Sequence, residues 1–287
     1  MAAEIPSIEN GGISEDFTTV TWRLKPGVTW SDGTPLTAAD VAFTADYCMA
    51  PGFGCAVLAE FEGIKTVEAV DDRTVRIHYG APKYPPLQAF VGGRTPILQK
   101  AQFEPCLGEA GASCTQQNFG PIGTGPFRVT SFEPGNVSTF EANPHYRDPA
   151  KPAFATVTIK GGGDAMAAAR AVLETGEFDF AWNLQLAPDI VAPMEAAGKG
   201  KLVGSFGSMV ERIELNQTDP SPALGKERST LAHPHPFLTD PAVRRALSMA
   251  IDRPILAELA YGPAGKPTCT IVPVPLDFTS GRDDCLK

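Results

Sequence analysis

The sequence predicts an α/β fold organised in about two domains. The chain has 287 residues, of which 43% are hydrophobic and 20% charged, which is enough to bury a sizeable core. Residues 18–44 change from a strand pattern to a helix pattern across a turn, and residues 156–182 follow the order strand, helix, strand. Such alternation is typical of an α/β layer with some parallel pairing of the strands.

Residues 18–44 form the most regular part of this pattern. Apolar and polar residues alternate over 20–24, which is the period of a strand with one buried face. Residues 30–33, Trp-Ser-Asp-Gly, indicate a turn, because aspartate can hydrogen-bond its own backbone and glycine adopts a positive φ easily. Thr37 precedes Asp40 by three residues, which is close to a capping box and predicts the start of a helix.

Residues 64–79 predict a β-hairpin. The segments 64–70 and 73–79 both alternate, and Asp71 and Asp72 lie between them. After a proline-rich break, residues 87–90 and 97–103 are expected to form short helices, and residues 104–118 a loop.

The second half of the chain continues the alternation. Its predicted strands lie at 127–132, 137–141, 156–160, 178–182, 201–206 and 209–216. Asp164 is a suitable N-cap for a helix that ends at Leu173. Residues 218–236 are expected to form an extended surface loop. Asp240 and Pro241 then begin a helix. Its expected buried stripe is Val243, Leu247, Ala250 and Ile251.

The charge and the hydropathy exclude two classes of partner. The net charge is −9 and the pI is about 5.0, which argues against nucleic acid or an anionic membrane as the main partner. No apolar run approaches the roughly 20 residues that a transmembrane helix needs.

The six cysteines predict three local disulfides, Cys48–Cys55, Cys106–Cys114 and Cys269–Cys285. Turn-forming glycines or prolines lie between the members of each pair, and no C-x-x-C motif points to a zinc or redox site. Disulfides imply an oxidising compartment. The alternative is six free buried thiols in a cytosolic protein.

The residues offer little support for catalysis. No G-x-S-x-G motif occurs, and the adjacent acidic pairs suit turns better than paired acid/base work. His233 and His235 could bind a metal, but prolines flank them and no cysteine or carboxylate cluster is near. We therefore predict no catalytic residue, no metal site and no cofactor.

A polar and aromatic cluster is the best candidate for ligand binding. Trp182, Asn183 and Gln185 follow a short predicted strand, and ligands of open α/β sheets bind beyond the carboxyl ends of strands. The indole offers a flat apolar wall, and the amides can donate and accept. Asn216, at the end of another predicted strand, is a second candidate. The alternative for each is ordinary structural hydrogen bonding.

Five motifs occur in the order found in one known family. They are W-S-D-G-T-P-L-T-A-A-D-V at 30–41, G-T-G-P-F at 123–127, N-P-H-Y at 143–146, G-E-F-D at 176–179 and V-R-R-A-L-S-M-A-I-D-R at 243–253. Together they resemble the extracellular solute-binding proteins, family 5. These are the oligopeptide, dipeptide and nickel receptors of ABC importers.

The resemblance implies a periplasmic-binding-protein-like fold (class II, peptide-binding type) with an extra small α+β domain. Residues 1–118 would form that extra domain, 119–215 part of the first ligand-binding lobe, and 216–287 the beginning of the second lobe. It also implies capture of peptides or a similar small solute by closure of two lobes, without enzyme activity. The partners would be the ligand and a membrane permease, and the protein would be exported to the periplasm or the cell surface.

Other expectations concern the ends of the chain and the alternatives. The first residues lack the basic and apolar regions of a signal sequence, and the last residues stop just past Cys285. We therefore expect a piece truncated at both ends, with a partial fold and with the charged ligand anchor outside it. A structural or partner-binding module and a metal-dependent hydrolase are the alternative functions. The ligand itself could be a peptide, a nickel chelate, haem or an oligosaccharide.

Overall fold

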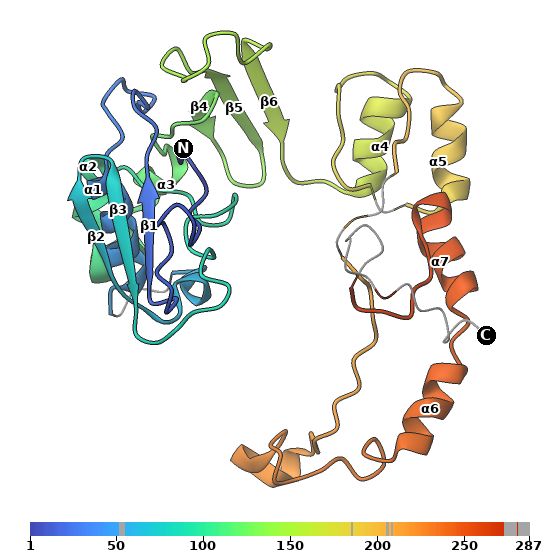
Figure 1. The fold of residues 1–287 in the computed structure, drawn as a ribbon. Helices are drawn as coiled ribbons and strands as arrows, with labels where there is room; N and C mark the ends of the chain where they lie inside the picture. Colours follow the sequence, from blue (N-terminus) through green and yellow to red (C-terminus); the bar gives the residue numbers. More distant parts are fainter. Residues whose placement is uncertain (52–54, 185, 205–206, 208, 273–279, 281–287) are drawn as a thin grey trace. The chain divides into compact units, whose positions relative to one another are not determined.

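The computed structural model describes residues 1–51, 55–184, 186–204, 207, 209–272 and 280. The chain divides into two compact units, Met1–Gly162 and Gly163–Lys287 (Figure 1). The first unit contains two β-sheets, and the described part of the second is built from helices. The predicted domain boundaries near residues 118 and 215 concern the complete family fold and stay a prediction.

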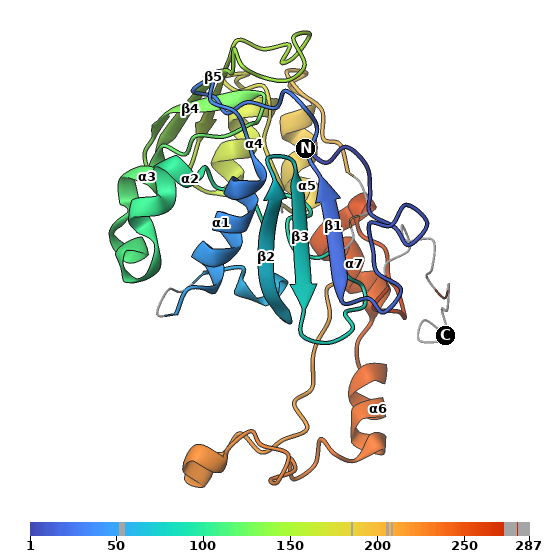
Figure 2. The same cartoon turned by 60° about the vertical axis from the view of Figure 1, so that its left-hand side comes forward.

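The first sheet has three antiparallel strands in the order β1–β3–β2. They are β1 (Thr19–Arg23), β2 (Ile64–Asp71) and β3 (Thr74–Tyr79). β2 and β3 form the predicted hairpin, and β1 pairs with the other edge of β3. Helix α1 (Ala38–Met49) packs against β2 and β3 (Figure 2).

The largest core of the first unit lies between this sheet and α1. In β3 the residues Val75, Ile77 and Tyr79 are buried, and the residues between them are not. Because successive side chains of a strand point to opposite faces, one face of β3 is turned to the core, as the alternation predicts. Helix α1 begins where the sequence predicts, because the Asp40 carboxylate accepts a hydrogen bond from the backbone amide of Thr37 at 2.8 Å.

The segment from 80 to 120 differs from the prediction in two places. Residues 87–90 form no helix. The predicted loop 104–118 contains short helical turns instead. They follow α2 (Lys100–Phe103) and are η2 (Glu104–Cys106), η3 (Gly108–Ser113) and α3 (Thr115–Phe119). An earlier turn of the same kind is η1 (Leu58–Phe61).

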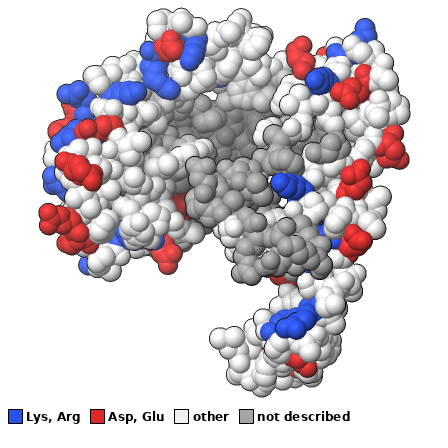
Figure 3. Space-filling model, turned by 45° about the vertical axis from the view of Figure 1, so that its right-hand side comes forward, with Lys and Arg blue, Asp and Glu red and all other residues white. Residues whose placement is uncertain are grey.

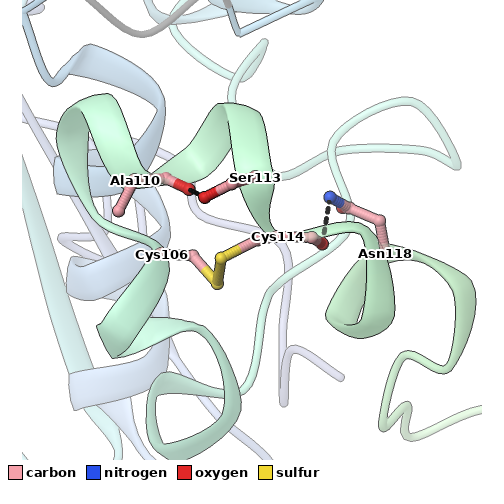
Figure 4. Close-up of a disulfide and its surroundings, with 5 residues drawn as sticks. All are labelled: Cys106, Ala110, Ser113, Cys114 and Asn118. Atoms are coloured by element: carbon pink, nitrogen blue, oxygen red, sulfur yellow. Dashed lines mark hydrogen bonds between the residues drawn. A yellow bond between two sulfur atoms is a disulfide. The ribbon is translucent and has the colours of Figure 1, made fainter.

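A disulfide bond lies within this series of short helical turns. Cys106 pairs with Cys114, and Cys48 pairs with Cys55, in two of the three predicted pairings. In Figure 4 the bond between Cys106 and Cys114 joins the end of η2 to the residue that follows η3, and Asn118 donates to the carbonyl of Cys114 at 2.9 Å. Cys106 is fully buried against the rings of Phe43, Tyr47 and Phe103. The third predicted pair includes Cys285, which lies outside the described residues, so that pairing stays a prediction.

The second sheet also has three antiparallel strands, in the order β4–β5–β6. They are β4 (Phe127–Phe132), β5 (Val137–Ala142) and β6 (Thr156–Lys160), at the predicted positions. Each strand pairs with the next one along the chain, which produces antiparallel neighbours. The expected parallel pairing is therefore absent from the part of the chain that the structure describes.

The second unit contains four α-helices in its described part. They are α4 (Ala165–Leu173), α5 (Pro188–Glu195), α6 (Pro241–Met249) and α7 (Arg253–Tyr261), with short turns η4 (Pro222–Glu227) and η5 (Gly262–Ala264). Asp164 and Asp240 cap α4 and α6 as predicted, since each carboxylate accepts an amide of the first turn. Its described hydrophobic core comes from α4 and α5: Ala169, Leu173, Val191 and Met194.

Four predictions for the second unit are wrong or unsupported. Residues 178–182 form no strand, and the described parts of 201–206 and 209–216 form none either. Strands need a neighbour for their backbone hydrogen bonds, and the described part of this unit offers no sheet. The predicted stripe of α6 is not buried, and Leu247 is 41% exposed.

The surface carries both signs of charge. In Figure 3, lysine, arginine and acidic side chains are mixed over the visible face of the first unit, so the net negative charge is not gathered in one patch there. Among the described residues, no helix has both the length and the apolar character needed to cross a membrane.

The disulfide between Cys106 and Cys114 should stabilise the first unit. We expect Cys106→Ser with Cys114→Ser to lower its free energy of unfolding by about 2–3 kcal/mol, because the bond closes a loop in the unfolded chain. Urea denaturation in a Trp182→Phe background measures this, since the remaining tryptophans, Trp22 and Trp30, lie in the first unit. The unsubstituted chain with both disulfides intact is the reference. Equal stability with and without the bond would contradict the expectation.

Candidate functional site

Three of the sequence motifs meet at one place in the first unit, here called the motif joint (residues 29–34, 123–126 and 143–146). The backbone amide of Ser31 donates to the carbonyl of Gly123 at 2.9 Å, and the hydroxyl of Thr29 donates to the carbonyl of His145 at 2.9 Å. Gly33 has a φ of 86°, and a β-carbon there would lie 3.2 Å from the His145 ring. Glycine is therefore required both by the backbone conformation and by the close approach.

Asn143 completes the motif joint. The side chain is buried, and its amide nitrogen donates to the carbonyl of Gly125 at 2.8 Å. The backbone amide of Asn143 donates to the carbonyl of Pro126, and its side-chain oxygen accepts from the backbone amide of His145. One side chain thus binds the two segments that enter and leave the strand pair β4–β5, and both ends of its amide group are used.

A polar network, in which Gln99 and Asp40 are buried, connects the motif joint to α1 and α2. Gln99 donates from its side-chain nitrogen to the Asp32 carboxylate at 2.8 Å and to the Thr34 hydroxyl at 3.1 Å. Asp40 accepts from the backbone amide of Lys100 at 2.9 Å. Burial raises the pKa of the Asp32 carboxyl, but hydrogen bonds from Thr34 and Gln99 outweigh it and leave that pKa below its ordinary value.

This network is structural in character. A hollow of about 330 Å³ opens beside it, and its lining includes Asp32, Asp40 and Glu104. The first two carboxylates are occupied by the hydrogen bonds above, and Glu104 lies 3.7 Å from the ammonium group of Lys100. Among the described residues, no group of three or more metal-binding side chains is placed to hold an ion.

The predicted ligand-binding cluster lies on the connection between α4 and α5. Trp182 is 82% exposed there, and Asn183 is also exposed, with a left-handed φ of 53°. The next residue, Leu184, packs against the core of the second unit. The connection is therefore anchored by Leu184 while the indole and the amide before it face solvent. Gln185 lies outside the described residues.

Asn216 has a different environment. Its side-chain oxygen accepts from the backbone amide of Thr218 at 2.9 Å and from the Thr218 hydroxyl at 2.6 Å. These bonds form an Asx turn, which is the structural alternative stated for this residue. They lie within its own turn and do not connect it to Trp182.

The two histidines of the H-P-H-P segment are engaged separately. His235 accepts from the amides of Phe237 and Leu238 through Nδ1, whereas Nε2 of His233 lies 3.9 Å from Glu227. The structure therefore gives each ring a local role in its loop.

One exposed aromatic residue escaped the sequence reasoning. Tyr84 is 83% exposed and packs edge-on against Phe17. The only signal in the sequence is an aromatic residue within a proline-rich break, which by itself predicts a loop and nothing more.

Comparison with known proteins identifies the family to which these motifs belong. The family model described as bacterial extracellular solute-binding proteins, family 5, middle region, matches residues 7–283. The glutathione-binding protein GsiB of Shigella boydii is 27% identical over 265 residues, which are 92% of this chain and 47% of GsiB. Protein XP55 of Streptomyces lividans is 29% identical over 276 residues, which are 96% of this chain and 44% of XP55. The chain spans about half the length of the curated relatives it matches.

Solved structures also resemble this chain, and one of them is a substrate-binding protein of an ABC transporter. The ABC transporter substrate-binding protein CtaP of Listeria monocytogenes superposes with a TM-score of 0.69 at 26% identity, over 96% of this chain and 52% of CtaP. NikZ of Campylobacter jejuni, solved in complex with Ni(L-His), gives a TM-score of 0.64 at 25% identity, over 86% of this chain and 44% of NikZ. The predicted fold class is thereby confirmed for the part of the fold that this chain covers.

The fit between Gly33 and His145 can be tested by adding one methyl group. We expect Gly33→Ala to lower the free energy of unfolding of the first unit by about 1–3 kcal/mol, because the positive φ and the imidazole ring both oppose a β-carbon. Urea denaturation in the Trp182→Phe background measures the change. Gly27→Ala is the matched control, since Gly27 has a φ of 71° with no atom within 4 Å of the added carbon. Equal losses at both positions would show that the His145 contact adds nothing.

Asp32 should make the stability of the first unit depend on pH. Because its folded-state pKa lies below the ordinary value, its ionised form stabilises the fold above the unfolded-state pKa of about 3.9, and this contribution is lost as the pH falls through the folded-state pKa. The advantage of wild type over Asp32→Asn should thus be present at pH 7 and shrink toward pH 3 in urea titrations. Asp46→Asn, at an exposed position of α1, is the control. A constant difference across this range would assign the effect to packing instead.

Proposed function

The chain belongs to family 5 of the bacterial extracellular solute-binding proteins, and on that basis we propose that it acts in the substrate-binding component of an ABC importer. The observation that carries the proposal is the match of the family model to residues 7–283, nearly the whole chain. The motif joint supports it, since three of the motifs contact one another there and the acidic groups beside them are held by hydrogen bonds or an ion pair. The family is one of transport proteins, not of enzymes.

The proposed ligand is a peptide or a similar small solute. Two relatives are named as binding glutathione and Ni(L-His), so small polar ligands with peptide-like groups are within the range of the family. We propose Trp182, Asn183, Gln185 and Asn216 as ligand contacts. Trp182 and Asn183 have the stronger support, because both are exposed on a connection anchored by Leu184.

The proposed mechanism is reversible capture. Two lobes close over the ligand around a hinge near Asn216, and the closed form delivers it to a membrane permease. In this proposal residues 1–118 form the extra domain, 119–215 part of one lobe and 216–287 the start of the other. The Cys48–Cys55 and Cys106–Cys114 disulfides support a periplasmic or cell-surface location, because such bonds persist in oxidising compartments.

One observation favours a partner-binding module as the second candidate function. Helices α6 and α7 expose large apolar side chains, namely Leu247, Met249, Ile255, Leu256 and Leu259. Exposed apolar side chains mark a protein interface where they gather into a large patch. The hydrolase alternative gains no comparable support from the described residues.

Saturation-transfer NMR tests the proposed function directly. We expect a pool of di- to pentapeptides to receive saturation from the chain, and a pool of oligosaccharides to receive none. Trp182→Ala should weaken peptide binding about 2- to 10-fold, the effect of losing one aromatic contact. Phe154→Ala is the matched control, since it removes another exposed ring, in the first unit. No transfer to any peptide, or equal binding by Trp182→Ala and wild type, would contradict the proposal or its assigned site.

A further inference from the structure

Phe17 has a backbone conformation that its side chain does not favour. Its φ is 55°, in the left-handed region, which a bulky side chain disfavours. Phe90 shares this feature with a φ of 64°, but its ring packs edge-on against buried Phe61 at a centroid distance of 5.4 Å. Core packing accounts for Phe90. The ring of Phe17 packs instead against Tyr84, at 5.8 Å and 83°, and Tyr84 is largely exposed.

The turn around Phe17 is held by several hydrogen bonds. The amide of Phe17 donates to the carbonyl of Ser14 at 2.9 Å. One oxygen of the Asp16 carboxylate accepts from the Ser14 hydroxyl at 2.6 Å and from the Thr18 hydroxyl at 2.8 Å. The same oxygen accepts from the Thr18 amide at 3.1 Å. These bonds offset the cost of the left-handed residue and fix the position of its ring.

The loop that carries Tyr84 is held as firmly. The amide of Lys83 donates to the carbonyl of Phe17 at 3.0 Å, and the amide of Gly80 donates to the carbonyl of Gly63 at 2.9 Å. The hydroxyl of buried Tyr79 donates to the carbonyl of Pro86 at 2.8 Å, which closes the loop from 79 to 86. Tyr84 thus projects from a loop that is pinned before and after it.

Stability of the first unit does not explain this arrangement. A ring that remains 83% exposed contributes little hydrophobic stabilisation, yet a strained residue is used to support it. A rigid aromatic ring loses little entropy when a ligand binds, so such a ring is suited to a binding contact.

We propose that Tyr84 is a binding platform for one apolar or aromatic side chain of a peptide ligand, with Phe17 as its positioning residue. This inference rests on the proposed function and deepens it, because it names the kind of ligand side chain that the chain would prefer. The face of the ring offers an apolar surface the size of one side chain, and its hydroxyl can bond to a peptide backbone. A protein partner would instead need a contiguous apolar patch of several hundred Å².

Fluorine NMR tests the platform in the full chain. The probes are the tripeptides Ala-Phe-Ala and Ala-Gly-Ala, and the label is 3-fluorotyrosine at position 84. We expect a saturable shift of this signal with Ala-Phe-Ala, at an affinity about 2- to 10-fold tighter than with Ala-Gly-Ala. A label at Tyr146, which packs under Arg147, is the control and should not move. Saturation transfer to the peptides reports binding independently of either label.

The outcomes separate this inference from the proposed function. Peptide binding without a change at position 84 overturns the platform alone. The absence of saturation transfer to both peptides would contradict the proposed function and, with it, the role of Tyr84.

Substitutions distinguish contact from support. Tyr84→Ala should abolish the preference for Ala-Phe-Ala, and Tyr84→Phe should keep it. Phe17→Gly should reduce the preference without lowering Tm, because glycine adopts the left-handed conformation freely. Phe17→Tyr, which keeps an aromatic ring at this position, should retain the preference for Ala-Phe-Ala that Phe17→Gly reduces. A Phe17→Gly chain that loses Tm but keeps the preference would show that Phe17 serves stability and would overturn its positioning role.

Discussion

The first unit depends on the contact between the 30–33 turn and the backbone on either side of strand pair β4–β5. Ser31 donates to Gly123, Thr29 donates to His145, and the ring of His145 occupies the space that a β-carbon on Gly33 would need. Thr29 and His145 are 116 positions apart, so this contact must overcome a considerable loop-closure entropy. Two residues of particular chemistry make the contact possible. Gly33 allows the close approach of the His145 ring, and Asn143 binds two segments with one amide group.

The polar residues near this joint are committed to structure, and the groups available for binding lie elsewhere. The hydrogen bonds of Gln99, Asp32 and Asp40 connect α1, α2 and the 30–33 turn to one another. The exposed aromatic rings of Tyr84 and Trp182 project from connections that are pinned by hydrogen bonds or by packing. The reversible capture proposed for this chain suits such a division, because preorganised surfaces bind at a small entropic cost and no bond has to be made.

The second unit shows how far helices can form without a large core. Asp164, Asp240 and Asp252 each cap a helix with a side-chain hydrogen bond, and Pro241 and Pro254 occupy first-turn positions. The apolar residues of α6 and α7 nevertheless remain exposed, whereas α4 and α5 bury theirs against each other. Local capping therefore determines where these helices begin, and packing alone determines which of their faces are covered.

The sequence by itself determined the features that depend on residues close together in the chain. The caps at Asp164 and Asp240, the hairpin across Asp71 and Asp72, and the short disulfides of Cys48 and Cys106 all rest on neighbours within about a dozen positions, and the order of the motifs identified the family. Only the tertiary structure decided that 178–182 has no strand partner in the described part of its unit, that Gly33 receives the His145 ring, and that left-handed Phe17 supports Tyr84. Pairing and close approach depend on distant residues, and no local pattern in a chain specifies which distant residues will meet.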